Sequence, residues 1–100
     1  MGDRVSIQFK RGKELSVVLF DHWGGMGRVT HAQKYADELK MLSRQIGSMP
    51  LGRREPQTVM VDYIRDITFN LPRVESSLYI GATENDGDNS DNGHHVISLD

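Results

Sequence analysis

The sequence contains no cysteine, and this absence removes several kinds of chemistry at once. Without thiols the chain can form no disulfide, hold no iron–sulfur cluster, and offer no thiolate as a nucleophile or zinc ligand. A cysteine-free chain is typical of a reducing compartment. We therefore expect a cytoplasmic protein whose fold is stabilised by packing and hydrogen bonds.

Long apolar runs and an excess of either charge are missing as well. No stretch reaches the roughly 20 apolar residues that a membrane-spanning helix requires, and residues 1–4 lead into a strand pattern rather than a secretory signal. The 12 Lys and Arg nearly balance the 14 Asp and Glu, which disfavours general nucleic-acid binding because that function needs a basic surface. The length predicts one domain over residues 1–100, with neither membrane nor nucleic acid as a partner.

The chain begins with the pattern of a β-hairpin. Apolar and polar side chains alternate without interruption over residues 4–10, as in a strand that is buried on one face. Gly12 lies in the expected turn, and residues 14–20 form the expected return strand. This return strand has apolar side chains on both faces, with Val18 and Phe20 on the face opposite the expected core.

Two helices are expected in the middle of the chain. Thr30 and Gln33 have the spacing of a capping box, which predicts a helix over residues 31–46 with Gly47 just after its end. A second helix is expected over residues 56–69, beginning with a proline at its first position. A strand is the rival interpretation of this second segment because its apolar residues also alternate, although a charged residue interrupts the series.

Two short strands are expected at the end of the chain, over residues 78–82 and 94–99, with the polar residues 83–93 between them. The element order is ββααββ. We predict an α+β domain in which two hairpins merge into a four-stranded antiparallel sheet, the last strand beside the second, with two helices packed on one face. The opposite face would expose apolar side chains, and a homodimer that buries them is one hypothesis. These side chains are Val18, Phe20, Tyr79 and Val96.

The segment between the second strand and the first helix is the main candidate site. It contains the single Trp of the chain and three of its ten Gly residues. Backbone N–H groups near a helix start and an arginine are what an anion needs, and the indole could stack on a flat group. The alternative is a tight corner in which the glycines only allow the chain to turn. The candidate ligand-binding residues are His22, Trp23, Gly24, Gly25, Gly27 and Arg28.

The polar segment near the C-terminus is the second candidate site. The sequence from Asp88 to Gly93 matches the first half of a calcium loop, in which alternate oxygen ligands surround the ion. The second half does not match, because Leu99 stands where the bidentate Glu is needed, so no EF-hand is expected. Ca²⁺ or another divalent ion is the cofactor that this pattern indicates, and the alternative is a solvated turn. The candidate metal ligands are Asp86, Asp88, Ser90, Asn92 and His94.

The chain resembles small uncharacterised proteins of archaea, bacteria and their viruses. The resemblance rests on His22-Trp23-Gly24-Gly25 after an N-terminal hairpin and on a late stretch rich in Asp and Asn. Those proteins continue an N-terminal hairpin with His-Trp-Gly/Asp-Gly and have no established activity. The resemblance implies no catalytic role. It implies that residues 21–28 and residues 84–95 meet in space.

These observations favour a small intracellular binding or interaction domain without chemistry of its own, whose partner is a protein or a small ligand. Its site would combine residues 21–28 with the acidic residues 84–95. The sequence leaves two alternatives open. One is a metal-dependent hydrolase that uses Asp21, His22 and His94, which an antiparallel last strand would bring together. The other is a structural or viral assembly module that associates through the apolar sheet face.

Overall fold

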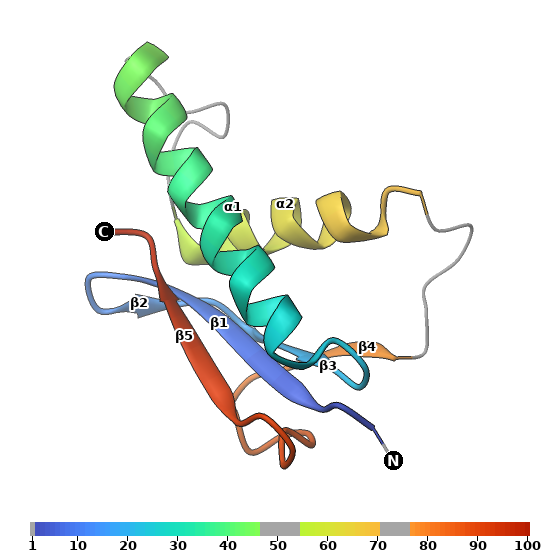
Figure 1. The fold of residues 1–100 in the computed structure, drawn as a ribbon. Coiled ribbons are helices and arrows are strands. Elements are labelled where there is room, and N and C mark those ends of the chain that lie inside the picture. Colours follow the sequence, from blue (N-terminus) through green and yellow to red (C-terminus); the bar gives the residue numbers. More distant parts are fainter. Residues whose placement is uncertain (1, 47–54, 71–76) are drawn as a thin grey trace.

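The computed structural model describes residues 2–46, 55–70 and 77–100, apart from the side chains of residues 42–46. The fold is mixed α+β, with two helices over one face of a five-stranded sheet (Figure 1). In the described part of the chain, neither helix is long and apolar enough to cross a membrane. The elements are β1 (Val5–Arg11), β2 (Glu14–Leu15), β3 (Val18–Asp21), α1 (Gly25–Ile46), α2 (Pro56–Thr68), β4 (Leu78–Gly81) and β5 (His94–Ser98).

Strand β1 is the centre of the sheet. On one side it pairs antiparallel with β2 and β3, which are two parts of the expected return strand. The two parts are separated at Ser16, whose hydroxyl oxygen accepts the Phe9 N–H at 3.0 Å. Strand β3 then pairs antiparallel with β4. The predicted strands over residues 4–10 and 14–20 are therefore confirmed, with one interruption in the second.

The last strand corrects the predicted topology. Strand β5 pairs parallel with β1, with Ser6 opposite His94, and not antiparallel with the second strand. The prediction of a four-stranded antiparallel sheet made from two hairpins is therefore wrong. The physical reason is that β4 takes the free edge of β3, so β5 must reach the other edge of the sheet. Residues 82–93, which we call the crossover, supply the dozen or so residues that such a connection requires.

The main core lies between the sheet and the helices. Within it the Tyr63 ring lies edge-on to Phe9, with centroids 5.5 Å apart, and 4.9 Å from the Tyr35 ring. This aromatic cluster joins β1, α1 and α2, so it holds both helices against the sheet. The buried cluster consists of Ile7, Phe9, Leu19, Ala32, Ala36, Leu39, Val59, Met60, Tyr63, Ile97 and Leu99.

The opposite face of the sheet is covered by the crossover, which runs below it from β4 to β5 (Figure 1). Phe20 stacks on Tyr79 with ring centroids 4.9 Å apart, and a Cβ at Gly87 would lie 2.8 Å from the Phe20 ring. Val18 and Phe20 are fully buried, whereas Tyr79 is 41% exposed. The expectation that Val18 and Phe20 face solvent is wrong, and a homodimer through this face loses two of its four proposed residues.

The two helices also differ in how well they were predicted. Helix α2 confirms the helical interpretation of residues 56–69, and the rival strand is wrong. Helix α1 begins at Gly25 instead of after Thr30. The Thr30 hydroxyl donates to the Met26 carbonyl at 3.2 Å inside the helix, so it is not the N-cap. The position expected to follow the helix, Gly47, lies outside the described residues.

Candidate functional site

The carboxylate of Asp21 organises the beginning of α1. Asp21 ends β3, and its Oδ1 accepts the N–H groups of Trp23 at 3.0 Å and Gly24 at 2.9 Å. Its Oδ2 accepts the Arg28 Nε–H at 2.9 Å. Asp21 is only 3% exposed, so an incoming anion would have to displace a buried, hydrogen-bonded charge. Arg28 and these two N–H groups are thus already bound to a carboxylate of the same chain.

Arg28 and Tyr63 extend this network to α2. Arg28 Nη1 donates to the Tyr63 hydroxyl at 3.3 Å, and that hydroxyl also hydrogen-bonds His31 Nδ1 at 2.8 Å. Burial alone would lower the pKa of Arg28, but its hydrogen bonds to Tyr63 and Asp21, with their charge interactions, raise it above its ordinary value. Burial raises the pKa of Tyr63. Near neutral pH Arg28 therefore stays charged and Tyr63 stays protonated. The network joins β3, α1 and α2, and we interpret it as structural.

The glycines at this corner have two different roles. A Cβ at Gly24 would clash with the Asp21 carboxylate, and a Cβ at Gly25 would clash with the Asp3 carboxylate. Gly25 also has a φ of +57°, which favours glycine. A Cβ at Gly27 would meet no atom of the described residues within 4 Å. Gly24 and Gly25 therefore allow close approach of carboxylates, whereas no contact among the described residues requires glycine at position 27.

Trp23 and Met26 are exposed apolar residues of the corner, with exposed fractions of 61% and 49%. The Trp23 ring meets the His22 ring edge-to-face, with centroids 4.5 Å apart. Because Asp21 accepts the Trp23 N–H, the indole projects from a backbone that is held in place. We call the following residues the corner surface: Asp3, His22, Trp23, Met26 and Gly27.

The crossover uses its polar side chains on its own backbone. Asp86 Oδ2 accepts two backbone N–H groups, at 2.7 and 2.8 Å, and Asp88 Oδ1 accepts the Ser90 N–H at 3.0 Å. Hydrogen bonds from Ser90 hold the pKa of Asp88 below its usual value. Within the described ranges no group of three or more His, Asp and Glu could hold a metal ion, so we assign no metal ligand. The predicted ligands that do not converge are Asp86, Asp88, Ser90, Asn92 and His94.

The corner and the crossover meet through the residues that precede β1. The Asp3 carbonyl accepts the Gly25 N–H at 2.9 Å, and Asp3 Oδ1 accepts a hydrogen bond from Asn92 Nδ2 at 2.7 Å. Arg4 Nε forms an ion pair with Asp88 at 3.2 Å. The two candidate segments therefore lie at the same end of the sheet, although the strand pairing that was expected to bring them together does not exist.

His94 is the centre of a separate polar cluster beneath the crossover. Its Nδ1 lies 2.8 Å from Ser6 Oγ, and its Nε2 lies 3.0 Å from Gln8 Oε1 and 3.5 Å from Glu84 Oε2. Serine, histidine and carboxylate are connected here as in a catalytic triad. However, Ser6 is fully buried and its oxygen accepts a hydrogen bond from Asn89 Nδ2. A substrate cannot reach this hydroxyl, so the cluster is not a hydrolytic site.

The residues of the proposed metal-dependent hydrolase, Asp21, His22 and His94, also fail to converge. Asp21 binds Arg28 on the helix side of the sheet, whereas His94 binds Ser6 on the side of the crossover. The cause is again the pairing of β5 with β1, which puts His94 one strand away from the end of β3.

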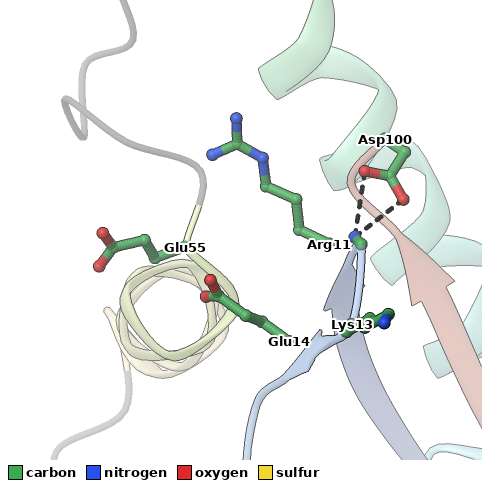
Figure 2. A pocket seen from close by; sticks show the side chains of 6 residues that line it. Arg11, Lys13, Glu14, Glu55 and Asp100 are labelled. Carbon is green, nitrogen blue, oxygen red and sulfur yellow. Dashed lines mark hydrogen bonds between the residues drawn. The ribbon is translucent and has the colours of Figure 1, made fainter.

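A shallow hollow of about 490 Å³ lies at the C-terminal end of β1, beside Arg11 (Figure 2). The Asp100 carboxylate accepts the Gly12 N–H there, at 3.1 and 3.2 Å to its two oxygens. Two basic and three acidic side chains line the hollow, so charges of both signs meet there. The lining residues are Arg11, Gly12, Lys13, Glu14, Glu55 and Asp100.

Sequence reasoning missed Asp3, Ser6 and Gln8. Alternation along the first strand predicts that Ser6 and Gln8 face solvent, but His94 of β5 contacts both, Asn89 of the crossover contacts Ser6, and both residues are buried. One signal could have indicated this, because residues 82–93 are more numerous than a hairpin turn needs.

Comparison with known proteins found no matching family model, no matching curated protein and no matching solved structure.

Proposed function

We propose that this chain is a binding domain whose corner surface recognises a cationic, partly apolar segment of another protein. The observation that carries the proposal is Trp23, a side chain 61% exposed on a backbone fixed by the buried Asp21 carboxylate. Tryptophan is among the residues most enriched at the centres of protein interfaces, because it offers a large rigid contact area. Prior fixation of its backbone reduces the entropy lost on binding.

The charge around Trp23 favours a cationic partner. The crossover and residues 2–4 together carry five carboxylates, against Arg4 as their one Lys or Arg. Asp3 connects this acidic surface to the corner by accepting the Gly25 N–H. The face of an indole also attracts cations. A segment with Lys or Arg beside apolar residues would therefore be steered by charge and anchored on Trp23.

Met26 and Gly27 support the same proposal. The unbranched side chain of Met adapts to irregular partner surfaces. A glycine inside a helix costs roughly 1 kcal/mol relative to alanine, and nothing within the described residues requires it at position 27. Close approach of a partner backbone would explain why position 27 is glycine.

Selection from a random peptide library displayed on phage tests the proposal. We expect the recovered peptides to be enriched in Lys and Arg. Synthetic versions should bind the folded chain and should bind the Trp23→Ala variant at least about tenfold more weakly. Raising the salt concentration from about 0.05 to about 0.3 M should also weaken binding, because exposed charge interactions are screened.

Phe69→Ala is the matched control, since Phe69 is also aromatic and is 81% exposed beside the end of α2. This variant should bind the selected peptides as well as the unaltered chain does. The proposal is wrong if the peptides bind Trp23→Ala undiminished, or if peptides without basic residues dominate the selection.

A further inference from the structure

The crossover has no helix or strand of its own, so its position depends on its contacts with the sheet and with Asp3 and Arg4 before β1. The Asp88 N–H donates to the Tyr79 hydroxyl at 2.9 Å, and Asn89 Nδ2 donates to Ser6 Oγ at 2.9 Å. The second of these contacts belongs to the cluster around His94. The protonation state of this histidine is therefore coupled to the attachment of the crossover.

The donors and acceptors around His94 indicate which ring nitrogen carries the hydrogen and where the Ser6 hydroxyl hydrogen points. Because Asn89 Nδ2 donates to Ser6 Oγ, the single Ser6 hydroxyl proton is directed to His94 Nδ1. Gln8 Nε2 donates to the Ser16 carbonyl at 2.8 Å, so Gln8 Oε1 faces His94 Nε2 and accepts a hydrogen bond from its N–H. A neutral ring protonated at Nε2 satisfies every member of this series.

A second proton on the ring disturbs this arrangement. It would bind Nδ1 and face the Ser6 hydroxyl proton across the 2.8 Å contact. Ser6 would then have to turn its proton toward a new acceptor, and Ser6 is fully buried beneath the crossover. An unsatisfied buried hydroxyl is unfavourable. Moving Asn89 and the crossover away lets water reach Ser6 and removes the conflict.

Glu84 and His95 are the titratable groups that act on the His94 ring. Glu84 Oε2 lies 3.5 Å from Nε2, but the Glu84 side chain is 55% exposed, so water weakens its attraction for a protonated ring. From β1 the ring meets the neutral side chains of Ser6 and Gln8. Burial lowers the pKa of His94 below its ordinary value, Glu84 opposes this effect, and His95 adds to it. The ring is therefore neutral near pH 7, and it becomes charged only below the pH at which an ordinary histidine does.

We infer that His94 is a pH-dependent latch, whose neutral ring holds the crossover on the sheet and whose protonation releases it while the helix–sheet core stays folded. This inference is independent of the proposed binding function, because it concerns the chain without a partner.

Amide hydrogen exchange measured by NMR at about pH 7.5 and about pH 5 tests the latch. The informative amides belong to Asp88, which donates to Tyr79, and Gly93, which donates to the Asn89 carbonyl at 2.7 Å. After correction for the intrinsic pH dependence of exchange, their protection should fall about tenfold at the lower pH. Protection in β1 and α2 should change little.

Three variants identify the group responsible. His94→Gln cannot titrate, so protection of the crossover should become the same at both pH values. His95→Gln is the matched control and should keep the loss of protection at low pH. Glu84→Gln removes the attraction that the attached crossover exerts on a protonated ring, so the midpoint of release should move to higher pH.

Protection that does not change with pH in the unaltered chain overturns the inference, as does a loss that persists in His94→Gln. If His94→Gln does not fold, the exposed Glu84→Gln variant decides. A midpoint that stays in place or moves to lower pH in that variant excludes the latch.

Discussion

Two glycines at the beginning of α1 should respond oppositely to the same substitution. Gly27→Ala should raise the free energy of unfolding by about 0.5–1 kcal/mol, because alanine restricts the unfolded chain and favours the helix, and its Cβ meets open space. Gly24→Ala should lower that free energy by about 1–3 kcal/mol, because its Cβ would displace the Asp21 carboxylate. Urea unfolding followed by circular dichroism measures both effects. A destabilising Gly27→Ala would show that this position needs glycine in the folded chain.

The residues of the corner show what sequence reasoning can and cannot supply about a site. The cluster of glycines beside a tryptophan identified the segment. Its interpretation as an anion site overlooked Asp21, whose carboxylate reaches the same N–H groups from a few residues away. A tethered carboxylate has a high effective concentration near those donors. The exposure of Trp23 could not be predicted, because it depends on which neighbours the fold provides.

At the scale of elements, local patterns predicted the strands and helices, but not the strand order. Alternation over residues 4–10 and the apolar stripe over residues 56–69 are local signals, and both elements formed as predicted. The partner of β5 depends instead on which sheet edges remain free after β4 has paired. That is a property of the assembled sheet. A polar segment between two strands is typical of a hairpin turn, and its length was the one indication of a crossover.

The crossover should be sensitive to small steric changes on its inner side. A Cβ at Gly87 would lie 2.6 Å from the Tyr79 ring and 2.8 Å from the Phe20 ring, so Gly87→Ala should lower the free energy of unfolding by about 1–3 kcal/mol. Asn85→Ala, on the exposed side of the same segment, should change it by less than about 0.5 kcal/mol. Urea unfolding compares the two variants. Equal effects would mean that the crossover does not pack on Phe20 and Tyr79 in solution.

At the scale of the whole molecule, the free energy of unfolding should decrease as the pH falls from about 7.5 to about 5. Burial lowers the pKa of His94 in the folded chain below its ordinary value of 6.5, so the unfolded chain binds the proton first. The stability contributed by the neutral ring is therefore fully present above pH 6.5 and is lost as the pH falls toward the folded-state pKa.

Urea unfolding at a series of pH values should show this slope in the unaltered chain and should lose most of it in His94→Gln. Because the main cause is burial and not a charge pair, added salt should leave the slope nearly unchanged. A slope that salt abolishes would instead assign the pH dependence to charge interactions at the surface. The salt series therefore separates a buried histidine from surface charge, which the pH series alone cannot do.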